Sequence, residues 1–108
     1  MANINKFLNH RSVLATSNTI LYTTPVTATT ILLSVQVTNI TGTPANVVFG
    51  MGNSSVNTSI IQSFPVPGND APIITNKLIL QPGEYIYASS ATSSALNIIV
   101  SILETLNA

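Results

Sequence analysis

Hydrophobic and polar residues alternate along most of this chain with a period of two. The longest example is residues 29–40 (TTILLSVQVTNI). Because successive side chains on a β-strand point to opposite faces, this alternation predicts a strand with one buried face. The buried face is expected to carry Ile31, Leu33, Val35 and Val37, and the opposite face Thr30, Ser34, Gln36 and Thr38.

The same alternation returns between residues that favour turns, and each return predicts another strand. These strands cover residues 45–51, 59–66, 73–74, 77–80, 85–88 and 95–104. A hairpin through Gly42 is the expected connection between the first two strands. In residues 81–84 (QPGE), the central proline and glycine predict a type II turn. Pro65 and Pro67 cannot donate backbone hydrogen bonds, so their strand is expected at a sheet edge or ending there.

About seven or eight short strands, separated by turns every 8 to 12 residues or so, predict an all-β fold. We expect an antiparallel β-sandwich or a jelly-roll-like barrel. A length of 108 residues fits one domain, which we assign to residues 19–108. Residues 1–18 are predicted to form a short N-terminal arm. Within this arm, Ile4, Phe7 and Leu8 have the spacing of one helical turn with an apolar side.

Charged side chains are rare in this chain. Three Lys or Arg and three Asp or Glu residues make up 6% of it, and the formal net charge is zero, whereas about 25% of an ordinary soluble domain is charged. Little electrostatic repulsion therefore opposes association. The arm carries two positive charges, Lys6 and Arg11, and the body is weakly acidic. We expect the outward apolar side chains to be covered by copies of the chain or by a larger scaffold.

Few residues of this chain could support catalysis or bind a metal ion. No cysteine is present, so disulfides and thiolate metal sites are excluded. His10 is expected to be solvated, and the spacing of the carboxylates Asp70, Glu84 and Glu104 does not imply convergence. Asn69 and Asp70 could contribute to a calcium site, but turn chemistry is the commoner role of such a pair. We predict no enzyme activity, no metal site and no cofactor.

Nucleic-acid and membrane partners are not expected either. The sequence has no GxxxxGK or GxGxxG loop, and three cations cannot supply the basic surface that nucleic acids require. It also lacks the apolar run of about 7 to 15 residues of a secretion signal, or of about 18 residues for a membrane span. We therefore expect the chain to remain in the cytosol until it assembles.

Two sets of surface residues are candidates for contact with partners. The candidate assembly contacts are Phe7, Arg11, Leu32, Ile79, Ile99 and Leu103. Tyr85 and Tyr87 alternate on one strand face, where two aromatic rings beside polar groups could bind a sugar. Aromatic rings of this kind more often cover a core edge or a subunit interface.

Five segments of the sequence have a distinctive pattern of strands and turns. They are residues 20–25 (ILYTTP), 37–43 (VTNITGT), 64–67 (FPVP), 78–86 (LILQPGEYI) and 100–104 (VSILE). These segments resemble small virion structural proteins of tailed bacteriophages. Together they extend over most of residues 19–104. Their motifs are patterns of strands and turns without catalytic residues. The chain departs from the pattern at residues 26–29, where the usual Ala-Gly turn is missing, and at Glu84, where Asp is commoner.

This resemblance implies a β-sandwich that joins a phage particle. The expected role is a non-enzymatic capsid decoration or cement protein, located in the virion and assembled in the host cytoplasm. Its partners would be copies of itself, as a homotrimer or another homo-oligomer, and the major capsid protein or another virion protein. The alternatives are a neck, tail or fibre component, or a carbohydrate-binding or receptor-binding module that uses Tyr85 and Tyr87.

Overall fold

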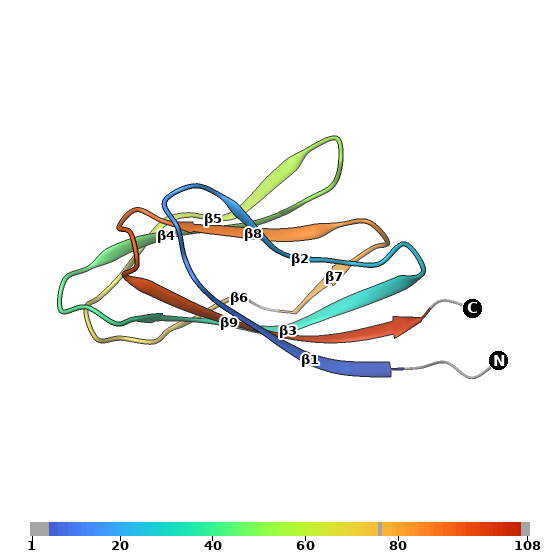
Figure 1. Ribbon diagram of the computed structural model, residues 1–108, viewed down its shortest axis with the longest axis horizontal. Helices are drawn as coiled ribbons and strands as arrows, with labels where there is room; N and C mark the ends of the chain where they lie inside the picture. The colour runs from blue at the N-terminus through green and yellow to red at the C-terminus, as the bar shows by residue number, and fades with distance from the viewer. Residues whose placement is uncertain (1–4, 76, 107–108) are drawn as a thin grey trace.

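The computed structural model describes residues 5–75 and 77–106 and consists of two β-sheets packed face to face (Figure 1). Its strands are β1 (Asn5–Val13), β2 (Thr19–Thr23), β3 (Ala28–Asn39), β4 (Ala45–Gly52), β5 (Asn57–Val66), β6 (Ile73–Thr75), β7 (Leu78–Leu80), β8 (Tyr85–Ser90) and β9 (Leu96–Leu106). All strand pairs are antiparallel. The predicted all-β sandwich is therefore confirmed, with nine described strands where about seven or eight were expected.

The strand order is that of a jelly roll. The five-stranded sheet has the order β1-β9-β3-β6, with β7 also paired to β3, and the four-stranded sheet has the order β2-β8-β4-β5. Most connections carry the chain from one sheet to the other, and the β4–β5 hairpin stays within one sheet. Double-sheet jelly rolls of this kind limit the number of exposed strand edges.

The core lies between the inward faces of the two sheets. On the five-stranded sheet it includes Val35 and Val37 of β3 and the alternating residues of β9. Phe49 of β4, the largest fully buried side chain, faces them from the other sheet. Because every second residue of each strand points into this space, aliphatic burial and strand pairing together stabilise the sandwich.

A β-bulge in β3 changes which residues are buried. The pairing of β3 with β9 shifts between Leu32 and Ser34, and one extra residue on a strand reverses the alternation that follows it. Val35 and Val37 are buried as predicted, but Ile31 is only half-buried, on the outer face. Leu32 was expected to face outward as an assembly contact. That prediction is wrong, because Leu32 is fully buried.

The turn through Gly42 does not form a hairpin. β3 pairs with β9, β6 and β7, whereas β4 pairs with β5 and β8, so residues 40–44 link the two sheets. The buried Asn39 organises this link: its Nδ2 donates to the carbonyl oxygens of Thr43 at 2.8 Å and Val66 at 3.0 Å, and its Oδ1 accepts from the Thr41 amide at 2.9 Å. Side-chain bonds of this kind satisfy backbone groups that no strand partner reaches.

The N-terminal segment forms a strand where one helical turn was expected. β1 pairs with β9 along nine residues, from Asn5 opposite Thr105 to Val13 opposite Asn97. The helical prediction is wrong because one isolated turn gains little, whereas the edge of β9 supplies a complete hydrogen-bonding partner. Ile4 lies outside the described residues. The division into an arm and a body at residues 18 and 19 stays a prediction.

Two turn and edge predictions are confirmed. Gly83 has φ of 84°, and the Glu84 amide donates to the Gln81 carbonyl oxygen at 3.0 Å, as a type II turn requires. β5, which contains Pro65, is an edge strand.

No helix that could span a membrane is found among residues 5–75 and 77–106.

Candidate functional site: the outer face of the five-stranded sheet

A row of four apolar side chains crosses the outer face of the five-stranded sheet. The strand registers place Phe7 opposite Leu103, Leu103 opposite Ile31, and Ile31 opposite Ile79. The row therefore spans β1, β9, β3 and β7, and we call these four residues the apolar row. Phe7 is 74% exposed and Ile79 is 63% exposed, while Leu103 and Ile31 are half-buried between them.

Another exposed apolar side chain lies farther along the same face. Ile99 is exposed and sits between Arg11 and Gln36 on the neighbouring strands. A polar row separates Ile99 from the apolar row: Asn9, Ser101 and Ser34 are register partners, and the Ser101 hydroxyl donates to Asn9 Oδ1 at 2.7 Å. The cores of protein interfaces are likewise depleted in charged side chains.

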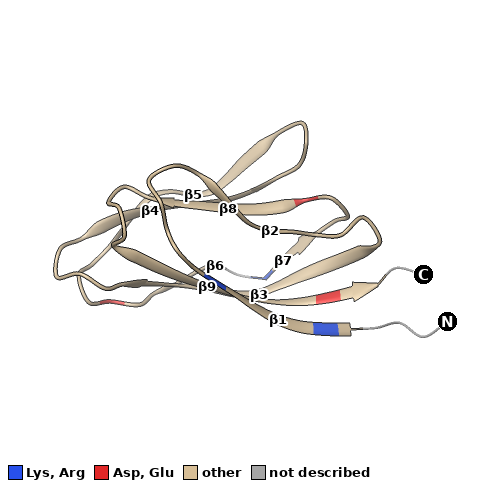
Figure 2. Cartoon of the chain, viewed as in Figure 1, with Lys and Arg blue, Asp and Glu red and all other residues tan. Residues whose placement is uncertain are grey.

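The outer face is almost free of charge. Within the described strands, Arg11 is the charged side chain on it, and Lys77 lies just before β7. Figure 2 shows the charged residues scattered over the fold instead of gathered on one surface. A second sheet could cover this face without burying an unpaired ion, which would be costly.

Four of the six predicted assembly contacts lie on this face as exposed or half-buried apolar residues. They are Phe7, Ile79, Ile99 and Leu103. Arg11 is also exposed there, at the margin, and Leu32 belongs to the core. The sequence analysis missed Ile31, which the β3 bulge places on the outer face. No signal in the sequence marks this bulge.

The two tyrosines proposed as sugar-binding groups have different surroundings. Tyr87 is 4% exposed, so the prediction that it faces a ligand is wrong. Tyr85 is half-buried, and its hydroxyl bonds to the Asn53 carbonyl oxygen at 3.2 Å and to Asn57 Oδ1 at 2.5 Å. It therefore ties the β4–β5 loop to β8 and does not pair with Tyr87 to form an aromatic platform.

The three carboxylates do not converge. Asp70 accepts a hydrogen bond from the Ala71 amide at 2.8 Å, and Glu84 accepts one from the Gln81 amide at 2.7 Å, so both support local turns. Glu104 is buried. In the described part of the chain, no three residues among His, Cys, Asp and Glu gather as a metal site would require.

Glu104 belongs to a polar cluster between the two sheets. The Tyr22 hydroxyl of β2 donates to Glu104 Oε2 at 2.5 Å and lies 2.9 Å from Thr30 Oγ1, and the Thr24 hydroxyl bonds to Thr30 at 3.2 Å. The ring of His10 tilts against that of Tyr22, with centroids 4.9 Å apart. The sequence offered a signal for this cluster, because Glu104 continues the inward alternation of β9.

Tyr22 makes the fold sensitive to alkaline pH. Burial, followed by the hydrogen bond to Glu104, raises the pKa of Tyr22 to about 12 from its usual 10.0. Between these two values the folded state keeps a proton that the unfolded chain loses. The contribution of Tyr22 to the free energy of unfolding is therefore complete below pH 10 and is lost as the pH rises towards 12.

We expect Tyr22→Phe to lower the free energy of unfolding by about 1–3 kcal/mol at neutral pH, because Glu104 loses its buried donor. The variant should also lose less stability than the native chain between about pH 8 and about pH 11.5. Urea denaturation across this range measures both effects. If the free energies of unfolding of the two proteins changed equally with pH, the assigned role of Tyr22 would be contradicted.

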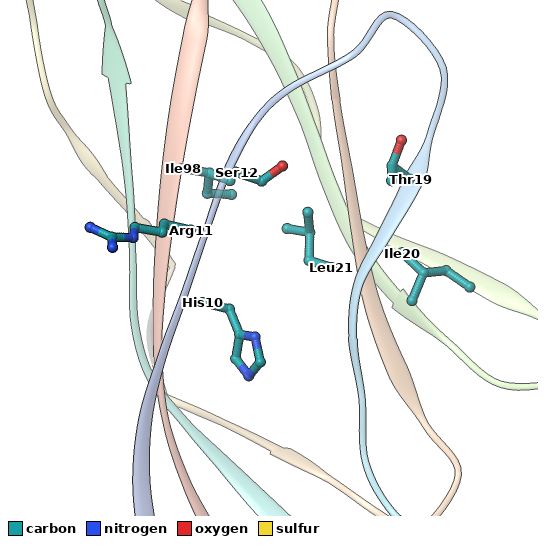
Figure 3. Close-up of a pocket in the computed structure, with 7 residues that line it drawn as sticks. All are labelled: His10, Arg11, Ser12, Thr19, Ile20, Leu21 and Ile98. Carbon is teal, nitrogen blue, oxygen red and sulfur yellow. The ribbon is translucent and has the colours of Figure 1, made fainter.

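A cleft opens between the edge strands of the two sheets (Figure 3). Residues of β1, β2 and β9 surround about 160 Å³ of space, and His10 and Leu21 point into it while Arg11 points to the other side of β1. The lining residues are His10, Arg11, Ser12, Thr19, Ile20, Leu21 and Ile98. This cleft holds one imidazole and no carboxylate, which is too little for general acid–base catalysis by a residue pair.

No protein family matches this chain. No curated protein sequence matches it either. Among solved structures, a protein of the disulfide-linked pili of Bacillus endospore appendages is similar, with a TM-score of 0.57 and 11% identity, over 98% of this chain and 89% of that one. The infectious bursal disease virus VP2 subviral particle has a TM-score of 0.56 and 6% identity, over 97% of this chain and 33% of that one.

The Gx strain of the same virus contains a chain with a TM-score of 0.55 and 8% identity, matched over 99% of this chain and 34% of its own length. This chain thus spans about a third of the viral chains and most of the pilus protein. At such low identities the likeness establishes a shared fold.

Proposed function

We propose that this protein is a non-enzymatic structural subunit that assembles with copies of itself through the outer face of the five-stranded sheet. The observation that carries the proposal is the apolar row, which is continuous across four strands and uncharged. Burying apolar surface contributes about 25 cal/mol per Å². When such a contact is repeated in a symmetric assembly, the subunits bind more tightly than one interface alone would allow.

The similar structures support an assembly role. Both kinds of neighbour, a pilus and a virus particle, are assemblies built from many subunits. The pili are disulfide-linked, whereas this chain contains no cysteine. Its assembly would therefore rest on noncovalent contacts.

The more specific form of the proposal comes from the sequence resemblance. It is a capsid decoration or cement protein of a tailed phage, located in the virion and bound to the major capsid protein or another virion protein as a homotrimer or other homo-oligomer. The carbohydrate-binding alternative is weakened because Tyr87 is buried. Cryo-microscopy of the assembled particle would test the virion location.

Ile79→Lys tests the apolar row directly. Because a lysine here would place an unpaired charge in the interface, we expect at least a tenfold weaker self-association and a free energy of unfolding changed by less than about 0.5 kcal/mol. Light scattering and sedimentation over a concentration series measure association, and urea denaturation measures stability.

Val26→Lys is the matched control. Val26 is 81% exposed in the turn between β2 and β3, outside the outer face. This variant should associate as the native chain does. A native chain that stays monomeric at all concentrations, or equal losses in the two variants, would overturn the proposed function.

A further inference from the structure

β1 is the most weakly buried long strand of the sandwich. Of its nine residues, Leu8 and His10 are half-buried and the rest are exposed. By contrast, β9 and β3 bury every second side chain along most of their length. In the described chain, β1 pairs with β9 alone and forms the edge of its sheet. Strands with little buried surface open at low free-energy cost.

Buried polar atoms without a hydrogen-bond partner also lie where β1 pairs with β9. In the described part of the chain, the buried side-chain polar atoms that lack a hydrogen-bond partner are His10 Nε2 and Asn97 Oδ1. His10 belongs to β1, and Asn97 lies opposite Val13 in the β1–β9 register. Leaving such atoms unsatisfied costs free energy, so the His10 defect weakens the β1–β9 pairing, whereas Asn97 lies on β9 between β1 and β3.

Clefts flank β1 on two sides. One is the 160 Å³ cleft towards β2, and the other, of about 420 Å³, is lined by residues 11–13 of β1 and 97–99 of β9. Both clefts are open to solvent, so few side chains pack against β1 on these two sides. Removing β1 from β9 therefore disrupts less packing than removing any inner strand would.

The chain is anchored to the body immediately after β1. Residues 15–18 are exposed, and backbone bonds anchor their start: the Leu14 amide donates to the Leu96 carbonyl oxygen at 2.9 Å, and the Ala15 carbonyl oxygen accepts from the Ser90 amide at 2.8 Å. Rotation of the backbone between Val13 and Leu14, ahead of this anchor, would swing β1 away while Leu14 remains in the core.

Opposite net charges favour contact between β1 and a body equally well within one copy and between two copies. Residues 1–18 carry two positive charges, and the remainder of the chain has a net charge of minus two. Lys6 lies directly opposite Glu104 in the register. In a neighbouring copy, the same edge of β9 would offer β1 the same backbone hydrogen bonds.

From these observations we infer that β1 is exchanged between subunits, so that β1 of one copy pairs with β9 of the next. This inference deepens the proposed function and rests on it. Exchange of an identical element costs little, because the strand pairing that opens within one copy forms again between two copies. It would add a hydrogen-bonded strand to each contact between subunits.

Cysteine cross-linking tests this exchange. The native chain has no cysteine, and Asn9 and Ser101 are register partners, with the Cα separation of about 4.5–5.5 Å that a disulfide can bridge. Asn9→Cys in a tagged chain and Ser101→Cys in an untagged chain are unfolded, mixed, refolded together, allowed to assemble and oxidised. Exchange predicts a mixed disulfide on a nonreducing gel.

The matched control replaces Ser101→Cys by Ser34→Cys, which lies on the same outer face next to Ser101 but on β3, not paired with β1. We expect at least tenfold more mixed disulfide with Ser101→Cys than with this control. Equal yields in the two mixtures would overturn the exchange, because contact through the outer face alone would bring both cysteine positions near Asn9→Cys of a neighbour.

A double variant, Asn9→Cys with Ser101→Cys, separates the two proposals. Oxidised as a monomer, it locks β1 onto its own β9, and we expect at least a tenfold loss of assembly that a reducing agent restores. Full assembly of the locked form would overturn exchange and leave the outer-face proposal intact. If the native chain never assembles, the proposed function itself fails.

Discussion

Phe49→Ala is expected to lower the free energy of unfolding by about 3–5 kcal/mol. Phe49 is fully buried and is the largest such side chain in the core. Its removal loses the transfer free energy of the ring and leaves a cavity between the two sheets that aliphatic neighbours fill only in part. The loss is a large share of the 5–15 kcal/mol or so that stabilises a typical domain. Urea denaturation at low protein concentration measures it.

Phe7→Ala provides the same chemical change at an exposed position. Phe7 is 74% exposed, so we expect its loss to change the stability of the monomer by less than about 0.5 kcal/mol. At high concentration the same variant should weaken self-association, since Phe7 belongs to the apolar row. Equal destabilisation by the two substitutions would contradict the assignment of the inner and outer faces.

Gly50→Ala is the second large effect that we expect. A Cβ at this position would lie 2.5 Å from the Thr58 carbonyl oxygen of β5 and would also collide with the Tyr87 hydroxyl. Because Thr58 O belongs to the backbone of a paired strand and Tyr87 is buried, neither neighbour can move freely. Overpacking of this kind costs about 3 kcal/mol.

Gly42→Ala is the control for the glycine substitution. A Cβ at Gly42 meets no atom within 4 Å, so the unfolding transition should stay within about 0.5 kcal/mol of the native value. Thermal denaturation of both variants gives the comparison. A native-like melting temperature for Gly50→Ala would show that β5 and Tyr87 do not press on β4 as described.

Local sequence pattern predicted seven of the nine described strands, β3 to β9. The period of two located β3, β4 and β9, and Pro82 with Gly83 predicted the turn between β7 and β8. These features depend on side-chain alternation and on the φ preferences of single residues, both of which are local properties. The scarcity of charge, which underlies the assembly proposal, is likewise a property of the sequence alone.

Tertiary structure decided how the strands pair and which apolar residues remain outside. Strand pairing joins distant residues, such as Phe7 with Leu103, and no local pattern encodes it. The bulge beside Leu33 reversed the alternation within β3, which buried Leu32 and moved Ile31 outward. The edge of β9 converted the N-terminal segment into a strand. An alternating pattern shows which residues share a strand face. The pairing with the partner strand determines which of the two faces is buried.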